Sequence, residues 1–140
     1  SSTHAADYYF ASASETGWFF VDLEKIETLK GGVKSAWTLM IHNTTEEHGS
    51  AYRRDEGWFN CEKRWYIALE FYDYRLDGKV RDNGRYSARR IDVKPGSVLE
   101  SQMDLVCTMT PNPAARLGDV APLQLTKLFR EKAKADREQH

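Results

Sequence analysis

The strongest constraint on the fold is an alternation of apolar and polar residues in segments that are separated by short turns. The segment Val33–His42 alternates with a period of two, so that Trp37 and Ile41 lie on one face of a strand. Asp77-Gly78 and Asn83-Gly84 are typical of tight hairpin turns. Because short connections join neighbouring strands in opposite directions, these segments predict an antiparallel sheet.

The longest alternating run, Trp58–Tyr74, predicts the central strand of this sheet. Taken as one uninterrupted strand, it places Trp37 and Trp65 on one face of the sheet and Tyr66 and Tyr72 on the other. The polar residues 43–57 before it predict a loop, with a short edge strand at residues 52–54. After the turns, residues 85–93 predict a further strand.

Two helices are predicted after the strands. Ser97 followed by Glu100 matches a capping box, and the apolar spacing that follows predicts a helix as far as Cys107. Leu125 and Phe129 mark one face of a last helix, which ends in a charged segment. The fold class expected is therefore α+β, with a single twisted antiparallel β-sheet, a helix packed on one face and a C-terminal helix.

The chain divides into three stretches. Residues 1–16 are small and polar apart from residues 8–10, and we expect a loosely ordered lead-in whose aromatic residues dock on the core. Residues 17–107 hold the predicted sheet, and residues 108–140 predict an extended, proline-containing connector followed by the C-terminal helix. The chain begins with a serine and has no evident leader, so we expect any signal peptide to have been removed.

Composition narrows the function classes. The 140 residues fit one domain, and 20 Lys and Arg against 21 Asp and Glu leave a formal net charge of −1. A nucleic-acid-binding protein normally carries a basic patch, so no nucleic-acid partner is expected. No apolar run is long enough to span a bilayer, and no phosphate-binding loop or nucleophile motif is evident. We expect no cofactor, no metal site and no catalytic residues.

The chain has two cysteines, Cys61 and Cys107, at the ends of two different predicted elements. This placement favours a disulfide, which would close a loop of 107 − 61 = 46 residues and stabilise the fold by roughly 4 kcal/mol in the chain-entropy model. The alternative is a pair of buried free thiols in the cytoplasm. Metal binding would need two more ligands, and only His42 and His48 are available. A disulfide implies an oxidising compartment, and hence export to the periplasm or cell surface.

A set of short motifs resembles the bacterial surface-adhesin protein E family. The motifs are an aromatic run leading into Asp and Ile, a strand with a central Trp, a Cys after Asn, a Tyr-Asp…Asp-Gly hairpin, and Pro-Gly-Ser before a final Cys. They lie at residues 17–26, 33–37, 60–62, 72–80, 93–98 and 106–107. The resemblance implies an exported protein of a Gram-negative bacterium, an antiparallel sheet, a Cys61–Cys107 bridge and adhesion to host or matrix proteins.

Aromatic and arginine side chains are the candidate binding residues, because these types concentrate in protein interfaces. An arginine beside an aromatic ring can bind an acidic group and stack at the same time. The alternative for the arginines, which include Arg53 and Arg54, is cross-strand pairing with acidic residues. The predicted binding residues are Trp37, Tyr66, Tyr72, Arg64 and Arg89.

These residues predict an exported, non-enzymatic binding module whose ligand is another protein or an unidentified small molecule. One alternative is a structural component of the cell envelope that acts through self-association as a homodimer. The other is a small hydrolase whose site is not evident in the sequence, and a deep polar cleft that holds His42 with a carboxylate would favour it.

Overall fold

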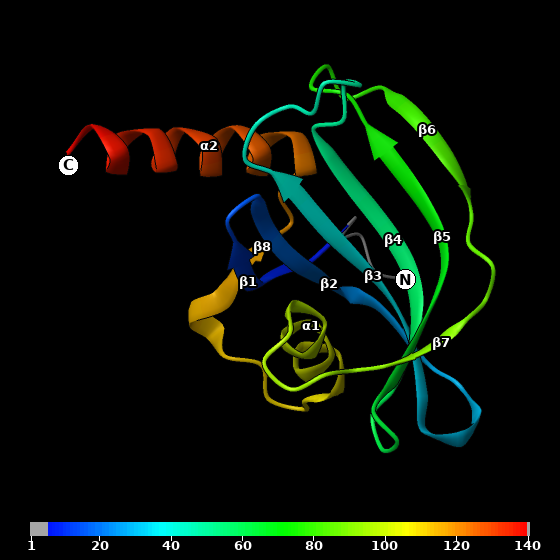
Figure 1. Ribbon diagram of the computed structural model, residues 1–140. Coiled ribbons are helices and arrows are strands. Elements are labelled where there is room, and N and C mark those ends of the chain that lie inside the picture. Colours follow the sequence, from blue (N-terminus) through cyan, green and yellow to red (C-terminus); the bar gives the residue numbers. More distant parts are fainter. Residues whose placement is uncertain (1–5, 140) are drawn as a thin grey trace.

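The computed structural model describes residues 6–139, which form one antiparallel sheet of eight strands with two helices (Figure 1). The strand order is β6-β5-β4-β3-β2-β1-β8, and β7 pairs with β5 beside β6. This arrangement confirms the predicted α+β class. The elements are β1 (Tyr8–Ser14), β2 (Gly17–Thr28), β3 (Val33–His42), β4 (Tyr52–Asn60), β5 (Trp65–Tyr74), β6 (Val80–Arg85), β7 (Arg90–Asp92), α1 (Val98–Cys107), β8 (Arg116–Gly118) and α2 (Pro122–Glu138).

The two helices cover different faces of the sheet, because consecutive residues of β2 belong to two separate cores. Phe20 packs with Leu125 of α2, whereas Val21 packs with Met103 of α1. We call these the α2 face and the α1 face. The C-terminal part of α2 extends away from the sheet (Figure 1), and its residues there are mostly exposed.

The long strand predicted at residues 58–74 is in fact two strands joined by a turn. Asn60 makes this turn, because its Oδ1 accepts hydrogen bonds from the backbone N–H groups of Glu62 and Lys63 at 3.1 and 2.9 Å. Arg64 completes it with a φ of 60°, in the left-handed region that few non-glycine residues adopt. Cys61 therefore lies in a turn and does not begin a strand.

The strand predicted at residues 52–54 is the start of β4, but β4 runs on to Asn60 and lies between β3 and β5, so its prediction as a short edge strand and that of a loop over residues 55–57 are wrong. The turn predicted at Asn83-Gly84 is also wrong, since both residues lie inside β6. A side chain at position 84 would approach the ring of Phe71 to 3.2 Å, so the glycine permits close packing between β5 and β6.

The predicted lead-in contains a strand. β1 pairs with β2 on one side and with β8 on the other. Just before it, Asp7 N–H donates to Asp22 Oδ1 at 2.9 Å, and Leu23 N–H donates to Asp7 O at 2.8 Å. The short strand β8 likewise lies inside the predicted connector. Residues 1–5 of the lead-in lie outside the described residues, as does His140 at the other end of the chain.

The first helix has the predicted bounds and the predicted N-terminal cap. Ser97 Oγ accepts a hydrogen bond from Glu100 N–H at 3.1 Å, and Glu100 Oε1 accepts one from Gly96 N–H at 3.0 Å. The last helix begins at Pro122, three residues before the first of its predicted apolar positions, since 125 − 122 = 3. In the described part of the chain, neither helix is long and apolar enough to cross a bilayer.

Cys61 and Cys107 form a disulfide, with their Cα atoms 5.7 Å apart. The bond joins the turn between β4 and β5 to the last residue of α1. Beside it, Arg64 Nη2 lies 3.2 Å from Glu100 Oε2 and 3.5 Å from Asp104 Oδ1. The covalent bond and these ion pairs hold α1 against the α1 face.

Candidate functional site

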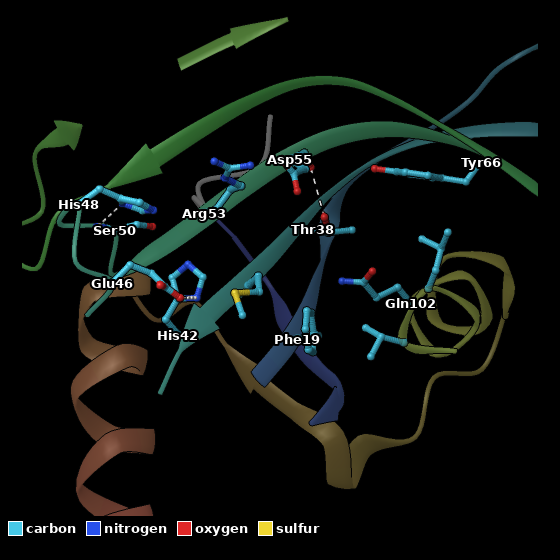
Figure 2. Close-up of a pocket in the computed structure, with 13 residues that line it drawn as sticks. Phe19, Thr38, His42, Glu46, His48, Ser50, Arg53, Asp55, Tyr66 and Gln102 are labelled. Atoms are coloured by element: carbon cyan, nitrogen blue, oxygen red, sulfur yellow. Dashed lines mark hydrogen bonds and ion pairs between the residues drawn. The ribbon is translucent and has the colours of Figure 1, made fainter. Parts of the chain in front are cut away.

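The α1 face carries an open pocket of about 670 Å³. Figure 2 shows Gln102 of α1 and Tyr66 of β5 at one end of it, and Glu46 and His48 of the β3–β4 loop at the other. Strands β2, β3 and β4 form its floor, which includes Phe19. The end beneath α1 is largely apolar, and the end beneath the loop is polar.

A network of hydrogen-bonded and ion-paired side chains lies at the polar end of this α1-face pocket. The Asp73 side chain has no solvent-exposed surface. It accepts hydrogen bonds from the Ser50 hydroxyl and from Arg81 Nε, the latter at 2.8 Å, and lies 3.7 Å from Arg53 Nη2. Burial by itself raises the pKa of Asp73, but the bonds from Ser50 and Arg81 outweigh it and lower this pKa.

Arg53 makes several contacts within this network. Its Nη1 donates to Tyr86 Oη at 3.3 Å, and Tyr86 Oη donates to Asp55 Oδ1 at 2.9 Å. The Arg53 guanidinium also lies over the ring of Phe71, with Cζ 4.5 Å from the ring centroid. Burial raises the pKa of Asp55, and the hydrogen bond from Tyr86 opposes this change. The two cations, Arg53 and Arg81, and the two anions, Asp55 and Asp73, therefore balance each other at this end of the pocket.

The geometry around His42 does not form a nucleophile–base pair. His42 Nδ1 lies 3.4 Å from Glu46 Oε1, and burial lowers the pKa of this histidine. The Ser50 hydroxyl donates to Asp73, while Ser50 N–H donates to His48 Nδ1 at 3.3 Å. A histidine that activates a serine must accept the hydroxyl proton, and neither histidine does so here. Among residues 6–139, no group of three or more His, Cys, Asp or Glu side chains could hold a metal ion.

The α2 face carries a continuous set of aromatic and arginine side chains, which we call the aromatic–arginine row. Arg54 Cζ lies 4.7 Å from the ring centroid of Trp37, and the Trp37 and Tyr72 rings are 6.1 Å apart. Arg54 Nη1 donates to Tyr74 Oη at 3.1 Å, and the Tyr74 ring stacks on Tyr52 at 4.8 Å. The row therefore crosses three neighbouring strands, β3, β4 and β5.

Beside the row lies a second hollow of about 530 Å³, which we call the α2-face cleft. Arg54 lines it together with tyrosines of three strands and residues around the start of α2. Burial raises the pKa of Tyr8 to about 12 and also raises the pKa of Tyr52, so both hydroxyls keep their protons at neutral pH.

The structure brings two of the five predicted binding residues together. Trp37 and Tyr72 meet in the row. Tyr66 lies on the α1 face, where it is only 8% exposed and packs on the ring of Phe59. Arg64 pairs with α1, and Arg89 is exposed in the segment between β6 and β7.

The predicted placement of Trp37 and Tyr72 on opposite faces is wrong, and a β-bulge is the cause. Glu56 pairs with Glu70, but the next residue, Gly57, pairs with Ala68. Leu69 is thus left without a partner in β4, and the alternation of β5 shifts by one residue from there. The same shift puts Tyr66 and Tyr72 on different faces.

Sequence reasoning missed the cleft. The sequence marks Arg54 only as one of several arginines near aromatic residues, and nothing in it singles out Tyr8, Tyr52 or Tyr74. The available signal was the number of tyrosines at strand positions. It could not show that three of them meet, because they lie far apart in the chain and come together only through strand pairing.

The geometry is that of a disulfide-bridged, antiparallel-sheet protein with aromatic and arginine side chains gathered on one face and no nucleophile–base pair at His42 or His48. The family model of surface-adhesin protein E matches residues 8–108. This match covers more than half of the chain, and the chain therefore belongs to the surface-adhesin protein E family. No curated protein matches it. The family suggests a surface-adhesin-like binding role, and together with the disulfide it fits an exported or surface protein.

Proposed function

We propose that the protein is an exported, non-enzymatic binding module that recognises a protein partner through the aromatic–arginine row. One observation carries the proposal: on the α2 face Trp37 contacts both Arg54 and Tyr72, which are paired across β4 and β5, and each of the three is only half-buried. Trp, Tyr and Arg are the residue types that contribute most to the free energy of protein–protein binding.

The row is also held in place before any partner arrives. Its members project from neighbouring strands, and Arg54 is fixed by both the Trp37 ring and the Tyr74 hydroxyl. Side chains that are already ordered lose less conformational entropy on binding, so more of the contact energy contributes to affinity. A flexible loop of the same composition would bind more weakly.

Membership of an adhesin family supports a partner outside the cytoplasm. The disulfide supports the same location, because such bonds form and persist in oxidising compartments. We therefore place the module in the periplasm or at the cell surface.

The test is binding to a panel of purified extracellular-matrix proteins by biolayer interferometry. We expect at least one member to bind, and Trp37→Ala and Tyr72→Ala each to weaken it by roughly tenfold or more. Trp58→Ala is the matched control, since Trp58 is a 37% exposed indole outside the row. Equal losses for Trp58→Ala and Trp37→Ala, or no binding to any member, would contradict the proposal.

Self-association is a second candidate, favoured by the outer edge of β6, which pairs with no other strand among residues 6–139. This strand ends the sheet, and Val80 at its start is 48% exposed. An unpaired strand edge can pair with a second copy of the chain. Measuring the mass in solution by light scattering tests this candidate, and a monomer at high concentration excludes it.

A further inference from the structure

We propose that the α2-face cleft binds a carboxylate of an acidic peptide segment in the protein partner. This inference rests on the proposed function for its choice of face and deepens it by naming the chemistry of the ligand. The cleft adjoins the row through Arg54, Tyr52 and Tyr74, which belong to both.

Arg54 lacks an anionic partner. Its guanidinium bonds to the Tyr74 hydroxyl, stacks on Trp37 and also interacts with the Tyr8 hydroxyl, all of them neutral groups. No carboxylate of residues 6–139 lies within 4.0 Å of it. Asp22 lies close enough to act on Arg54 through its charge, but Asp22 Oδ1 already accepts bonds from Asp7 N–H and Glu24 N–H. A half-buried guanidinium binds a carboxylate with two parallel hydrogen bonds when one is supplied.

The remaining polar groups of the cleft are mainly donors. Lys25 contributes a second cation, which forms no ion pair with the described part of the chain. The hydroxyls of Tyr8 and Tyr52 stay protonated and can donate. Among the lining residues Asp119 is the one acid, and the charge of the buried Asp22 also reaches Arg54 and Tyr8 from behind the wall. A site rich in donors and poor in acceptors favours a ligand that accepts hydrogen bonds.

The start of α2 adds to the same preference. Ala121, its N-cap residue, and Pro122 both line the cleft. No side chain caps this end of the helix, and its first turn contains no acidic residue. The positive end of the helix dipole therefore remains without a compensating charge from the helix itself.

The apolar part of the cleft wall favours some anionic ligands over others. Val120, Ala121 and Pro122 form one side, and the stacked rings of Tyr52 and Tyr74 lie in the same cleft. A volume of about 530 Å³ accommodates one or two side chains. A carboxylate next to an apolar or aromatic residue satisfies both parts of the wall. A highly sulfated polysaccharide would leave the apolar side unused and would be repelled by Asp119.

Calorimetry with two matched tetrapeptides tests the proposal directly. The probe is an acetylated, amidated peptide with two glutamates between two phenylalanines, and its control replaces both glutamates by glutamines. We expect the acidic peptide to bind at least roughly tenfold more tightly than the amide peptide, with a Kd near the millimolar range. Arg54→Gln should weaken binding of the acidic peptide by roughly tenfold, and Lys25→Gln by a few-fold.

Two further variants keep the result interpretable. Arg89→Gln removes the same charge from an exposed site away from the cleft and should leave the affinity unchanged. Tyr72→Ala removes a member of the row that does not line the cleft. If Tyr72→Ala binds the peptide normally while no matrix protein of the panel binds the parent protein, the proposed function is contradicted and the inference about the cleft still stands. If a matrix protein binds but the acidic peptide does not, only the inference about the cleft is contradicted.

Four outcomes overturn the inference. They are no detectable binding of the acidic peptide, equal binding of the two peptides, an Arg54→Gln variant that binds as well as the Arg89→Gln variant, and binding of heparin that Arg54→Gln weakens without any binding of the peptide. Thermal melting of each variant verifies that the fold is intact before binding is measured.

Discussion

Arg53 and Arg54 are neighbours in the chain, yet their surroundings differ in almost every respect. Arg53 lies on the α1 face, where it approaches Asp73 and bonds to Tyr86. Arg54 lies on the α2 face, where a phenol hydroxyl and an indole ring are its direct partners. Each arginine stacks on an aromatic ring, but only Arg53 belongs to an ion-paired network.

The difference shows what an arginine in a strand can contribute. A guanidinium whose charge is balanced by a buried carboxylate holds strands together, and removing either member leaves the other uncompensated. A guanidinium held only by neutral groups is equally well positioned but keeps its capacity to bind an anion. The α1 face is therefore expected to respond to mutation through stability, and the α2 face through binding.

The largest effect is expected from the disulfide, which strengthens the α1 face alone. Reduction should lower the free energy of unfolding by roughly 4 kcal/mol and the melting temperature by roughly 10 °C. Thermal melts with and without reductant measure this change. The Cys61→Ala, Cys107→Ala double variant is the control and should not respond to reductant. An unchanged melt of the parent protein would contradict the assigned bond.

The second largest loss of stability is expected from removing the buried carboxylate of Asp73. Asp73→Ala leaves Arg53, Arg81 and Ser50 without their shared partner, and we expect a loss of about 3 kcal/mol. Urea denaturation measures it. Asp119→Ala is the matched control, because Asp119 forms no ion pair with the described residues and should change stability by less than about 0.5 kcal/mol.

The two arginines themselves provide the direct comparison. Arg53→Gln should cost about 1–2 kcal/mol of stability, since it removes one cation from a network that Arg81 still neutralises in part. Arg54→Gln should cost less than about 1 kcal/mol, because only a hydrogen bond to a phenol and a stacking contact are lost. Urea denaturation of both variants gives the order, and a larger loss for Arg54→Gln would reverse our assignment of the faces.

The smallest effect is a dependence on pH. The pKa of Asp73 is lower in the folded protein than in the unfolded chain, so its contribution to stability is complete above the unfolded value, near 3.8, and is lost as pH falls through the folded value. The stability difference between the parent and Asp73→Asn should therefore be constant at neutral pH and shrink below about pH 4. A difference that stays constant to pH 2 would mean that folding does not lower the pKa of Asp73.

Much of the fold follows from local patterns. The alternation of β3, the cap of α1 and the antiparallel arrangement were predictable because each depends on residues close together in the chain. The interior position of β4 was not, since Arg53 and Asp55 look like loop residues until their partners Asp73 and Tyr86 are known. Charged residues enter a sheet when distant residues neutralise them.

The sequence by itself determined the α+β class, the resemblance to the surface-adhesin protein E family, and the two cysteines that bond. Only the tertiary structure decided which side chains share a face. A single unpaired residue, Leu69, shifts the alternation of β5 and brings Tyr72 to Trp37. Such a bulge depends on the register between two strands, which is set by packing across the whole sheet and leaves no local mark in the chain.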